Sequence, residues 1–414
     1  MPEPDRPPIV LTTQCVVAGG GPAGLTLGFL LARSGVDVIV LEKHADFLRD
    51  FRGDTIHPST MELMAELGLL ERFLELPHQK VPKIFAQFGE ERLQLADFAR
   101  LPVRAPFIAM MPQWDFLTFL AENAAALPGF RLRMGAEARD LVVEDGRVVG
   151  LRAETAEGPA EIRAALTVAT DGRGSRLRAA AGLAVRDLGA PIDVLWFRLS
   201  RRPDDTDETQ GRFEAGRLFV MLNRGDYWQC AYVVAKGSFE AVKARGLAAF
   251  QADLRPLLPF AEARAAELAD WDQVKLLGVQ VNRLETWSRP GLLCIGDAAH
   301  AMSPVGGVGV NLAIQDAVAA ANALAGPLRR GEVAERDLKA VQRRRAWPTR
   351  ATQALQILVQ NRVLLAALES DAPIRPPRAL RVIAAVPGLR DLPAWIIGMG
   401  LRRERLRAPQ AGRS

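Results

Sequence analysis

The sequence is poor in residues that form disulfides and metal sites. Its 414 residues include only three cysteines, Cys15, Cys230 and Cys294, and four histidines. The cysteines are far apart and form no C-x-x-C pair, which argues against a redox dithiol and predicts buried, reduced thiols. The histidines are too scattered for a metal site. We therefore expect neither a disulfide framework nor a bound metal.

Signals for export and for membrane insertion are also lacking. Residues 1–8 are acidic and rich in proline, without the basic start and the apolar run of a secretory signal. No apolar stretch reaches the length of an uninterrupted membrane span. Together with the reduced cysteines, these features predict a cytoplasmic protein.

The charge balance favours anionic ligands. An excess of arginine gives a formal net charge of +5, which suits nucleotide phosphates. The arginines are spread along the chain without a nucleic-acid module or interleaved aromatic residues, so we expect no nucleic-acid partner. The composition, 49% hydrophobic and 24% charged, is that of a globular chain with room for two or three packed parts and a large buried cofactor.

The order of the expected elements is that of an α/β fold. A strand at 14–18, a helix at 22–33 and a strand at 36–41 form a βαβ unit. The segment 191–234 alternates as antiparallel strands do, interrupted by the polar loop 201–211. A helical stretch at 237–269 precedes another strand, and helices dominate thereafter.

A glycine-rich motif joins the first strand to the first helix. Gly19, Gly21 and Gly24 form G-x-G-x-x-G, and Pro22 is the first helical residue. Glycine is required where the turn is tight, where amides approach a pyrophosphate and where the helix packs on the strand. Glu42, about twenty residues on at the end of the second strand, can accept a hydrogen bond from a ribose 2′-hydroxyl. This pattern predicts a dinucleotide site, and the motif alone leaves NAD and FAD open.

Two further motifs resolve that choice. One strand runs into Asp171-Gly172-Arg173, and a later strand runs into Gly296-Asp297. With them the sequence resembles the flavoprotein monooxygenases of the p-hydroxybenzoate hydroxylase fold, whose fingerprints are G-x-G-x-x-G, a DG motif and a GD motif. The resemblance extends to about residue 327. The long form of the GD motif is reproduced at Pro304, Gly306, Gly307, Gly309, Asn311, Asp316 and Ala317.

This resemblance implies a fold and an activity. The fold would be α/β, with a doubly wound, Rossmann-like FAD-binding domain (8–77, 105–182 and 276–327), an inserted antiparallel β-sheet substrate domain (78–104 and 183–275) and a C-terminal helical region (328–414). The activity would be that of an FAD-dependent monooxygenase. It would use noncovalent FAD, NAD(P)H and O₂ to hydroxylate an aromatic or other electron-rich small molecule through a flavin hydroperoxide.

The resemblance also implies roles for single residues. Asp297 would contact a ribityl hydroxyl, Gln113 would lie along the ribityl chain, and Arg52 would contact the adenosine or pyrophosphate. Pro304 would lie beside the flavin ring. The amides of the helix that begins near Gly309 would point at the flavin pyrimidine. The remaining predicted cofactor contacts are Pro22, Ala23, Lys43, Asp171, Gly307, Val310 and Asn311.

Several assignments stay open. Asp171 can instead cap a turn, since Asp-Gly is a common turn pair. A structural role is favoured for His300. For His57, a position in the active-site pocket and a position at the start of a helix are equally favoured. The catalytic residues are unassigned, because the chemistry belongs to the flavin, with Pro304 and His57 as pocket candidates. Half or more of the sheet aromatics are expected to be core, namely Trp196, Phe197, Phe219, Tyr227, Trp228 and Tyr232.

Other functions on the same fold remain alternatives. A halogenase is disfavoured by the absence of W-x-W-x-I-P, and a disulfide reductase by the absence of a cysteine pair and of a second dinucleotide unit. A prenyl-chain reductase stays open. A non-catalytic binding protein would lose the flavin contacts of the GD motif, whereas Asp297 and its glycine loop are intact here.

The C-terminal segment has two interpretations. Residues 392–399 are apolar and include Trp395, and an arginine run follows at 402–407. A tryptophan and apolar residues beside clustered cations are typical of contact with an anionic membrane. Docking against the protein's own core is the favoured interpretation, because most apolar C-terminal segments do this.

Overall fold

The first strand, β1 (Ile9–Ala18), lies in the middle of a parallel sheet. The computed structural model describes residues 8–48, 55–260, 262–408 and 410–411. Strands β2 (Val38–Leu41) and β11 (Gly158–Ala169) flank β1, and β8 (Phe130–Arg133) and β20 (Leu292–Cys294) extend the sheet to the order β20-β11-β1-β2-β8. All four residues of β2 are buried, as expected for a parallel strand covered on both faces.

Antiparallel strands complete this sheet. The hairpin of β9 (Glu137–Glu144) and β10 (Arg147–Thr155) pairs with β11, and β19 (Ser288–Arg289) pairs with β20. The strands expected at 14–18 and 36–41 are confirmed as β1, which begins several residues earlier, and β2, and the strand expected before Asp171 is β11. The additional residues at the start of β1 alternate between partly exposed and exposed positions, unlike the buried run that follows them.

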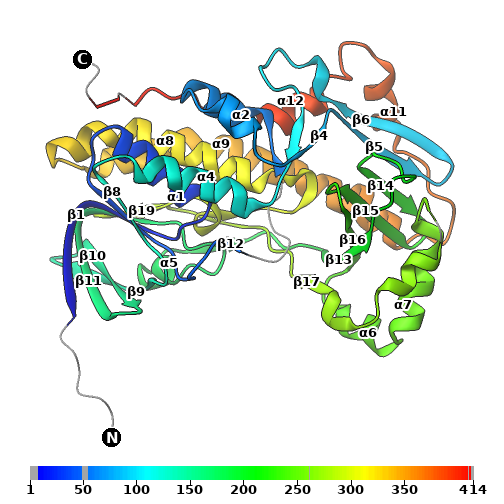
Figure 1. Cartoon of the computed structure of the whole chain (residues 1–414), viewed down its shortest axis with the longest axis horizontal. Helices are drawn as coiled ribbons and strands as arrows, with labels where there is room; N and C mark the ends of the chain where they lie inside the picture. Colours follow the sequence, from blue (N-terminus) through cyan, green and yellow to red (C-terminus); the bar gives the residue numbers. More distant parts are fainter. Residues whose placement is uncertain (1–7, 49–54, 261, 409, 412–414) are drawn as a thin grey trace, which may run out of the picture.

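Helices cover one side of the parallel strands (Figure 1). Helix α1 (Pro22–Arg33) packs against α4 (Gln113–Ala125) and α8 (Gly309–Arg330), and α9 (Glu335–Val359) lies against α8. Among the described residues, one helical stretch, Val305–Arg330, is long and apolar enough to cross a membrane, but 72% of its apolar window is buried inside the protein. It is a core helix.

A second sheet carries the antiparallel strands that the sequence predicts. Two of its strands come from residues 83–97 and the others from residues 192–277, so segments far apart in the sequence share one sheet. Its order is β17 (Lys275–Leu277), β13 (Ile192–Ser200), β16 (Tyr227–Ala235), β15 (Arg217–Asn223), β14 (Gln210–Glu214), β5 (Lys83–Phe88) and β6 (Glu91–Asp97).

Opposite faces of this second sheet have different neighbours. One face packs on α6 (Phe239–Ala244) and α7 (Leu247–Leu254), and four of the six sheet aromatics belong to that core. The other face includes Trp196 and packs against residues of α9 and the segment after it. The expectation that half or more of the aromatics are core is confirmed. The four core aromatics are Phe197, Phe219, Trp228 and Tyr232.

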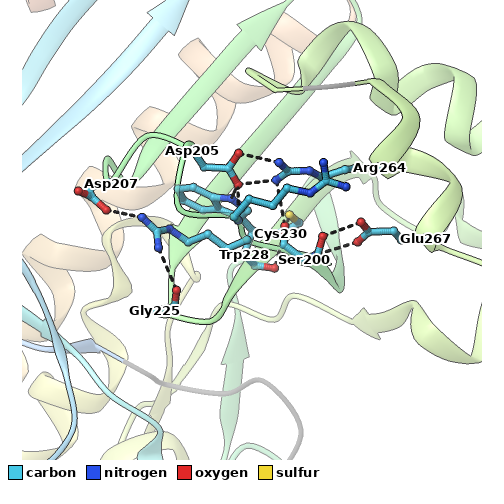
Figure 2. Close-up of polar contacts among 10 residues, drawn as sticks. Ser200, Asp205, Asp207, Gly225, Trp228, Cys230, Arg264 and Glu267 are labelled. Carbon is cyan, nitrogen blue, oxygen red and sulfur yellow. Dashed lines mark hydrogen bonds and ion pairs between the residues drawn. The ribbon is translucent and has the colours of Figure 1, made fainter.

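The polar loop between β13 and β14 is fixed by a buried ion pair (Figure 2). Arg264 donates hydrogen bonds to both carboxylate oxygens of Asp205, and the bond from Nη2 to Oδ1 is 2.8 Å long. Both side chains are at most 3% exposed. The indole nitrogen of Trp228 donates to Asp205 at 3.0 Å. Burial opposes ionisation of Asp205, but these donors hold the pKa of its carboxyl well below the ordinary range. The loop therefore has a fixed conformation.

The remaining elements connect the two sheets and close the fold. The helical stretch expected at 237–269 is broken into α6, α7 and short 3₁₀ turns. The others are β3 (Thr55–Ile56), α2 (Pro58–Glu66), α3 (Leu70–Leu74), β4 (Gln79–Val81), β7 (Ile108–Met110), α5 (Arg176–Ala180), β12 (Val185–Asp187), β18 (Asn282–Leu284), β21 (His300–Ala301), α10 (Leu365–Leu368), α11 (Arg378–Ala385) and α12 (Leu392–Met399).

Helix α12 docks on the protein. Ala394 and Met399 are buried and pack with Phe98 and Leu101, as favoured from the sequence. The opposite side of the helix exposes Leu392 (47%) and Trp395 (46%). The chain then returns to the first helix, where the amide of residue 411 donates to the carbonyl of residue 33.

Candidate cofactor-binding site

The three sequence motifs meet at one edge of the parallel sheet. The register pairs Ala18 with Ala169 and Ala169 with Cys294, so the last residues of β1, β11 and β20 lie side by side. The loops that follow these strands carry the glycine-rich, DG and GD motifs. Ligands of open α/β sheets bind outside the carboxyl ends of the strands, and this edge is therefore the candidate site.

Close packing requires two of the motif glycines. Gly19 has a φ of +112°, and a Cβ there would lie 2.4 Å from the carbonyl oxygen of Thr170. A Cβ on Gly24 would lie 1.9 Å from the carbonyl oxygen of Gly19. Gly21 faces open space, and no side chain caps the helix that begins at Pro22. The helix N-terminus is thus open to an anionic group such as a diphosphate.

Glu42 lies beside this loop. Its side chain is buried, and its two carboxylate oxygens accept hydrogen bonds from the amides of Gly20 and His44, each at 3.1 Å. A carboxylate oxygen can accept more than one hydrogen bond, so this geometry leaves room for the predicted ribose contact. Lys43, next to it, is exposed.

Asp171 caps a turn and still has one carboxylate oxygen without a protein partner. One carboxylate oxygen accepts the amides of Arg176 and Leu177 at 2.9 and 3.3 Å, which is the turn-capping role. The other oxygen is buried and has no partner within the described structure. Burial raises the pKa of this carboxyl. A buried, unpaired acceptor is costly unless a ligand supplies a donor, so this oxygen fits a cofactor hydroxyl.

The GD motif adds a second carboxylate. Asp297 follows β20, its side chain is 34% exposed, and it lies 3.6 Å from Arg173 of the DG segment. The DG and GD motifs therefore touch each other. Arg173 leaves one side of Asp297 accessible, which suits the predicted ribityl contact.

The glycine loop before α8 is held against β3. Gly307 has a φ of +62°, a Cβ there would lie 2.7 Å from Thr55 Oγ1, and that hydroxyl donates to the Gly307 carbonyl at 3.1 Å. Pro304 is partly buried at the start of this loop. The α8 N-terminus at Gly309 and Val310 has no side-chain cap.

The side chain of Asn311 is used inside the protein. Its oxygen accepts the His57 amide at 3.0 Å and the Thr60 hydroxyl at 2.8 Å, and its nitrogen donates to the Thr55 carbonyl at 3.2 Å. These bonds join α8 to β3 and α2. The side chain of Asn311 is therefore occupied, and any contact with a cofactor would come from its backbone amide.

The two histidines singled out from the sequence are both buried. His57 precedes α2, and its Nδ1 lies 2.7 Å from the carbonyl oxygen of Ile397, so Nδ1 carries the proton. Burial lowers the pKa of His57 to about 4. The geometry favours the helix-start role. His300 lies 2.6 Å from Asp316, in the structural role that the sequence favours.

A hollow of about 330 Å³ lies beside the start of α4 and the turn after Glu42. Its aromatic and apolar walls suit a purine ring, and sequence reasoning missed it because its lining comes from three separated segments. Gln113 begins α4 at this end, whereas Arg52 lies outside the described residues. The lining residues are Ala45, Asp46, Phe47, Leu48, Trp114, Thr118, Leu132 and Met134.

A second hollow of about 150 Å³ lies between the N-terminal end of α8, α9 and α12. Its walls include Val305, Leu312, Pro348 and Ile396. None of the predicted cofactor residues except Asn311 lines it. The candidate dinucleotide site therefore consists of the glycine loop, the open helix N-terminus and the unpaired Asp171 oxygen, with the hollow of about 330 Å³ as a candidate purine site.

Comparisons with known proteins agree with this geometry. A sequence family described as FAD binding domain matches residues 12–355. A 6-methylpretetramide 4-monooxygenase of Streptomyces rimosus is 34% identical over 393 residues, which span 94% of this chain and 93% of that protein. A rifampicin monooxygenase of Streptomyces venezuelae is 29% identical over 73% of this chain and 62% of its own length.

Solved structures share the fold. A p-nitrophenol 4-monooxygenase from Pseudomonas putida superposes with a TM-score of 0.74 at 21% identity and covers 95% of this chain and 100% of that one. The chain belongs to the FAD-binding-domain family and is an FAD-dependent monooxygenase of the class that its three motifs indicate. The predicted α/β fold and FAD cofactor are confirmed.

Proposed function

We propose that this monooxygenase takes its electrons from NADH or NADPH and hydroxylates an aromatic or other electron-rich small molecule in the cytoplasm. The observation that supports this most is the convergence of three flavin motifs in a chain 34% identical, over nearly its full length, to a 6-methylpretetramide monooxygenase. FAD, when bound, supplies hydride acceptance and oxygen activation. The protein supplies binding, orientation and exclusion of water.

The proposed contacts with FAD follow from the geometry of the candidate site. The amides at the start of α1 bind the diphosphate, Glu42 accepts from the adenosine ribose, and Asp297 and the free oxygen of Asp171 accept from hydroxyls along the chain of the cofactor. The helix dipole at Gly309 stabilises negative charge on a reduced flavin. Pro304 borders the ring.

The second sheet supplies the substrate pocket in this proposal. Trp196 lies on the sheet face opposite α6 and α7, and its indole nitrogen is buried without a partner within the described structure. Such a donor suits a carbonyl or phenol oxygen. In this proposal, FAD is bound by residues 8–77, 105–182 and 276–327. The substrate is bound by residues 78–104 and 183–275, and residues 328–414 form a helical region.

Anaerobic reduction by NADH and by NADPH tests this proposal, repeated over a panel of phenols, quinones and aromatic polyketides. The described residues contain one Rossmann-like parallel sheet, so the nicotinamide has to react without a second such unit of its own. We expect slow reduction alone and reduction about tenfold faster or more with a true substrate, as a substrate-driven shift of conformers gives. Stopped-flow absorbance of the flavin band measures both rates.

Two results would contradict it. If neither NADH nor NADPH reduces the flavin with any compound of the panel, a nicotinamide is not the electron donor. Fast reduction that a confirmed substrate leaves unchanged would reject substrate control, although the nicotinamide assignment would stand.

A further inference from the structure

A buried carboxylate joins the GD motif to the C-terminal part of the chain. Asp316, on α8, has no exposed surface. It accepts hydrogen bonds from the Gly296 amide at 3.1 Å, from His300 Nε2 at 2.6 Å and from Arg345 Nε at 2.8 Å. Burial opposes its ionisation, but His300 and Arg345 hold its pKa below the ordinary value. The carboxylate therefore fixes the residue next to Asp297.

Arg345 extends this network to a distant segment. It is 1% exposed, and its Nη1 donates to the Arg402 carbonyl at 3.0 Å and to Glu404 Oε1 at 3.3 Å. Glu404, 5% exposed, also accepts from Arg344 Nε at 2.7 Å, and its amide donates to Gln315 on α8. Residues 402–404 are thus bonded to α8 and α9 through backbone and side chains.

We propose that Arg345 and Glu404 are positioning residues of the flavin site. They act through Asp316, which holds Gly296 and hence Asp297, and they fix α8, whose N-terminus faces the predicted flavin pyrimidine. Neither side chain is assigned a contact with the cofactor. A buried charge network contributes little net stability compared with apolar packing, but it specifies one arrangement. Here the arrangement specified is that of the GD turn relative to α8.

The inference rests on the FAD site and is independent of the substrate and of oxygen. Its test uses Glu404→Gln, which keeps the side-chain volume and removes the charge that Arg345 pairs with. We expect FAD affinity, measured by flavin fluorescence quenching, to weaken about tenfold, equivalent to about 1.4 kcal/mol. We also expect a more negative flavin midpoint potential, because a displaced α8 N-terminus stabilises the reduced anion less. Melting of the cofactor-free protein is measured in parallel.

The matched control is Glu332→Gln, the same substitution on a side chain that is 75% exposed. It should leave affinity and potential unchanged. Arg345→Lys is the second variant, because lysine keeps the charge but loses the planar fork that reaches Asp316 and Glu404 together. It should shift affinity and potential in the same direction as Glu404→Gln.

Two outcomes would overturn the proposal. One is wild-type affinity and potential in both variants. The other is a lower melting temperature of the cofactor-free protein with an unchanged potential, which would show a purely structural role. If Glu404→Gln or Arg345→Lys does not fold, Arg344→Gln replaces it, since Arg344 contacts Glu404 from the partly exposed side. It should weaken FAD binding about twofold, and no change in affinity or potential would equally reject the proposal.

Discussion

Asp297 is the motif carboxylate with most access to a ligand. Its side chain is 34% exposed, and Arg173 lies 3.6 Å away. Glu42 and Asp171, in contrast, already accept hydrogen bonds from backbone amides. The contribution of Asp297 to binding can therefore be separated from folding more cleanly than that of the other two acids.

Asp297→Ala should weaken FAD retention. Without this carboxylate a ribityl hydroxyl loses its acceptor in a partly buried site, at a cost of about 1.5–3 kcal/mol for a bond to a charged group. That corresponds to roughly 10- to 150-fold in affinity. The ratio of FAD to protein after gel filtration measures it, with Asp272→Ala as an exposed control. Retention equal to that of the wild type would contradict the assignment.

His57 should make stability depend on pH. Its folded pKa is about 4, below the ordinary value of 6.5, because it is buried. The unfolded chain then binds more protons in this window, so stability is fully present above pH 6.5 and falls as the pH drops towards 4. The loss is at most about 3 kcal/mol.

His57→Asn isolates this effect. The amide of Asn can donate to the Ile397 carbonyl, as Nδ1 does, without titrating. Chemical denaturation between pH 7 and pH 4 should show a shallower decline for this variant than for the wild type, while His44→Asn, at an exposed position, should follow the wild type. Parallel declines in all three proteins would show that His57 does not account for the pH dependence.

At the scale of elements, the sequence predicts what depends on local pattern. Helix α1 has the predicted bounds, because Pro22 starts it and Gly35 ends it. The stretch 237–269 was less predictable: Pro256 and Gly246 divide it, and tertiary packing under the second sheet sets the pieces. The strand expected at 14–18 is the more buried half of β1, whereas residues 9–12 alternate between partly exposed and exposed positions.

Helix α12 tests the docking interpretation of the C-terminus. A Cβ on Gly398 would lie 3.1 Å from a Leu101 methyl and 3.2 Å from the Phe98 ring. Gly398→Val should therefore destabilise the protein by about 1–3 kcal/mol through overpacking, measured by denaturant unfolding. Gly388→Val, where a Cβ meets nothing within 4 Å, is the matched control.

A membrane role for this helix predicts something else. If α12 were released from Phe98 and Leu101 to lie on a bilayer, Gly398→Val would have no effect on unfolding, and flotation with anionic vesicles would fall on truncation before Pro393. We expect equal flotation of the full-length and truncated proteins. Reduced flotation of the truncated protein, together with unchanged stability of the valine variant, would support the membrane instead.

At the scale of the whole molecule, the site was predictable and its surroundings were not. Three motifs that each follow a strand have to converge if the strands are parallel neighbours, and the sequence therefore predicts the edge of the sheet where the candidate cofactor site lies. The roles of Asn311 and His57 depend on contacts with α2 and α12, which no local pattern encodes. The larger hollow draws its lining from three separated segments for the same reason.

The central claim is that one oxygen atom passes from O₂ to a small molecule. The measurement that tests it most directly is turnover under ¹⁸O₂ of the panel compound that most accelerates flavin reduction, with mass spectrometry of the product. We predict one heavy oxygen atom in the product when the label is in the gas, and none when it is in the water. Label from water, or hydrogen peroxide without any oxygenated product for every compound, would contradict the account.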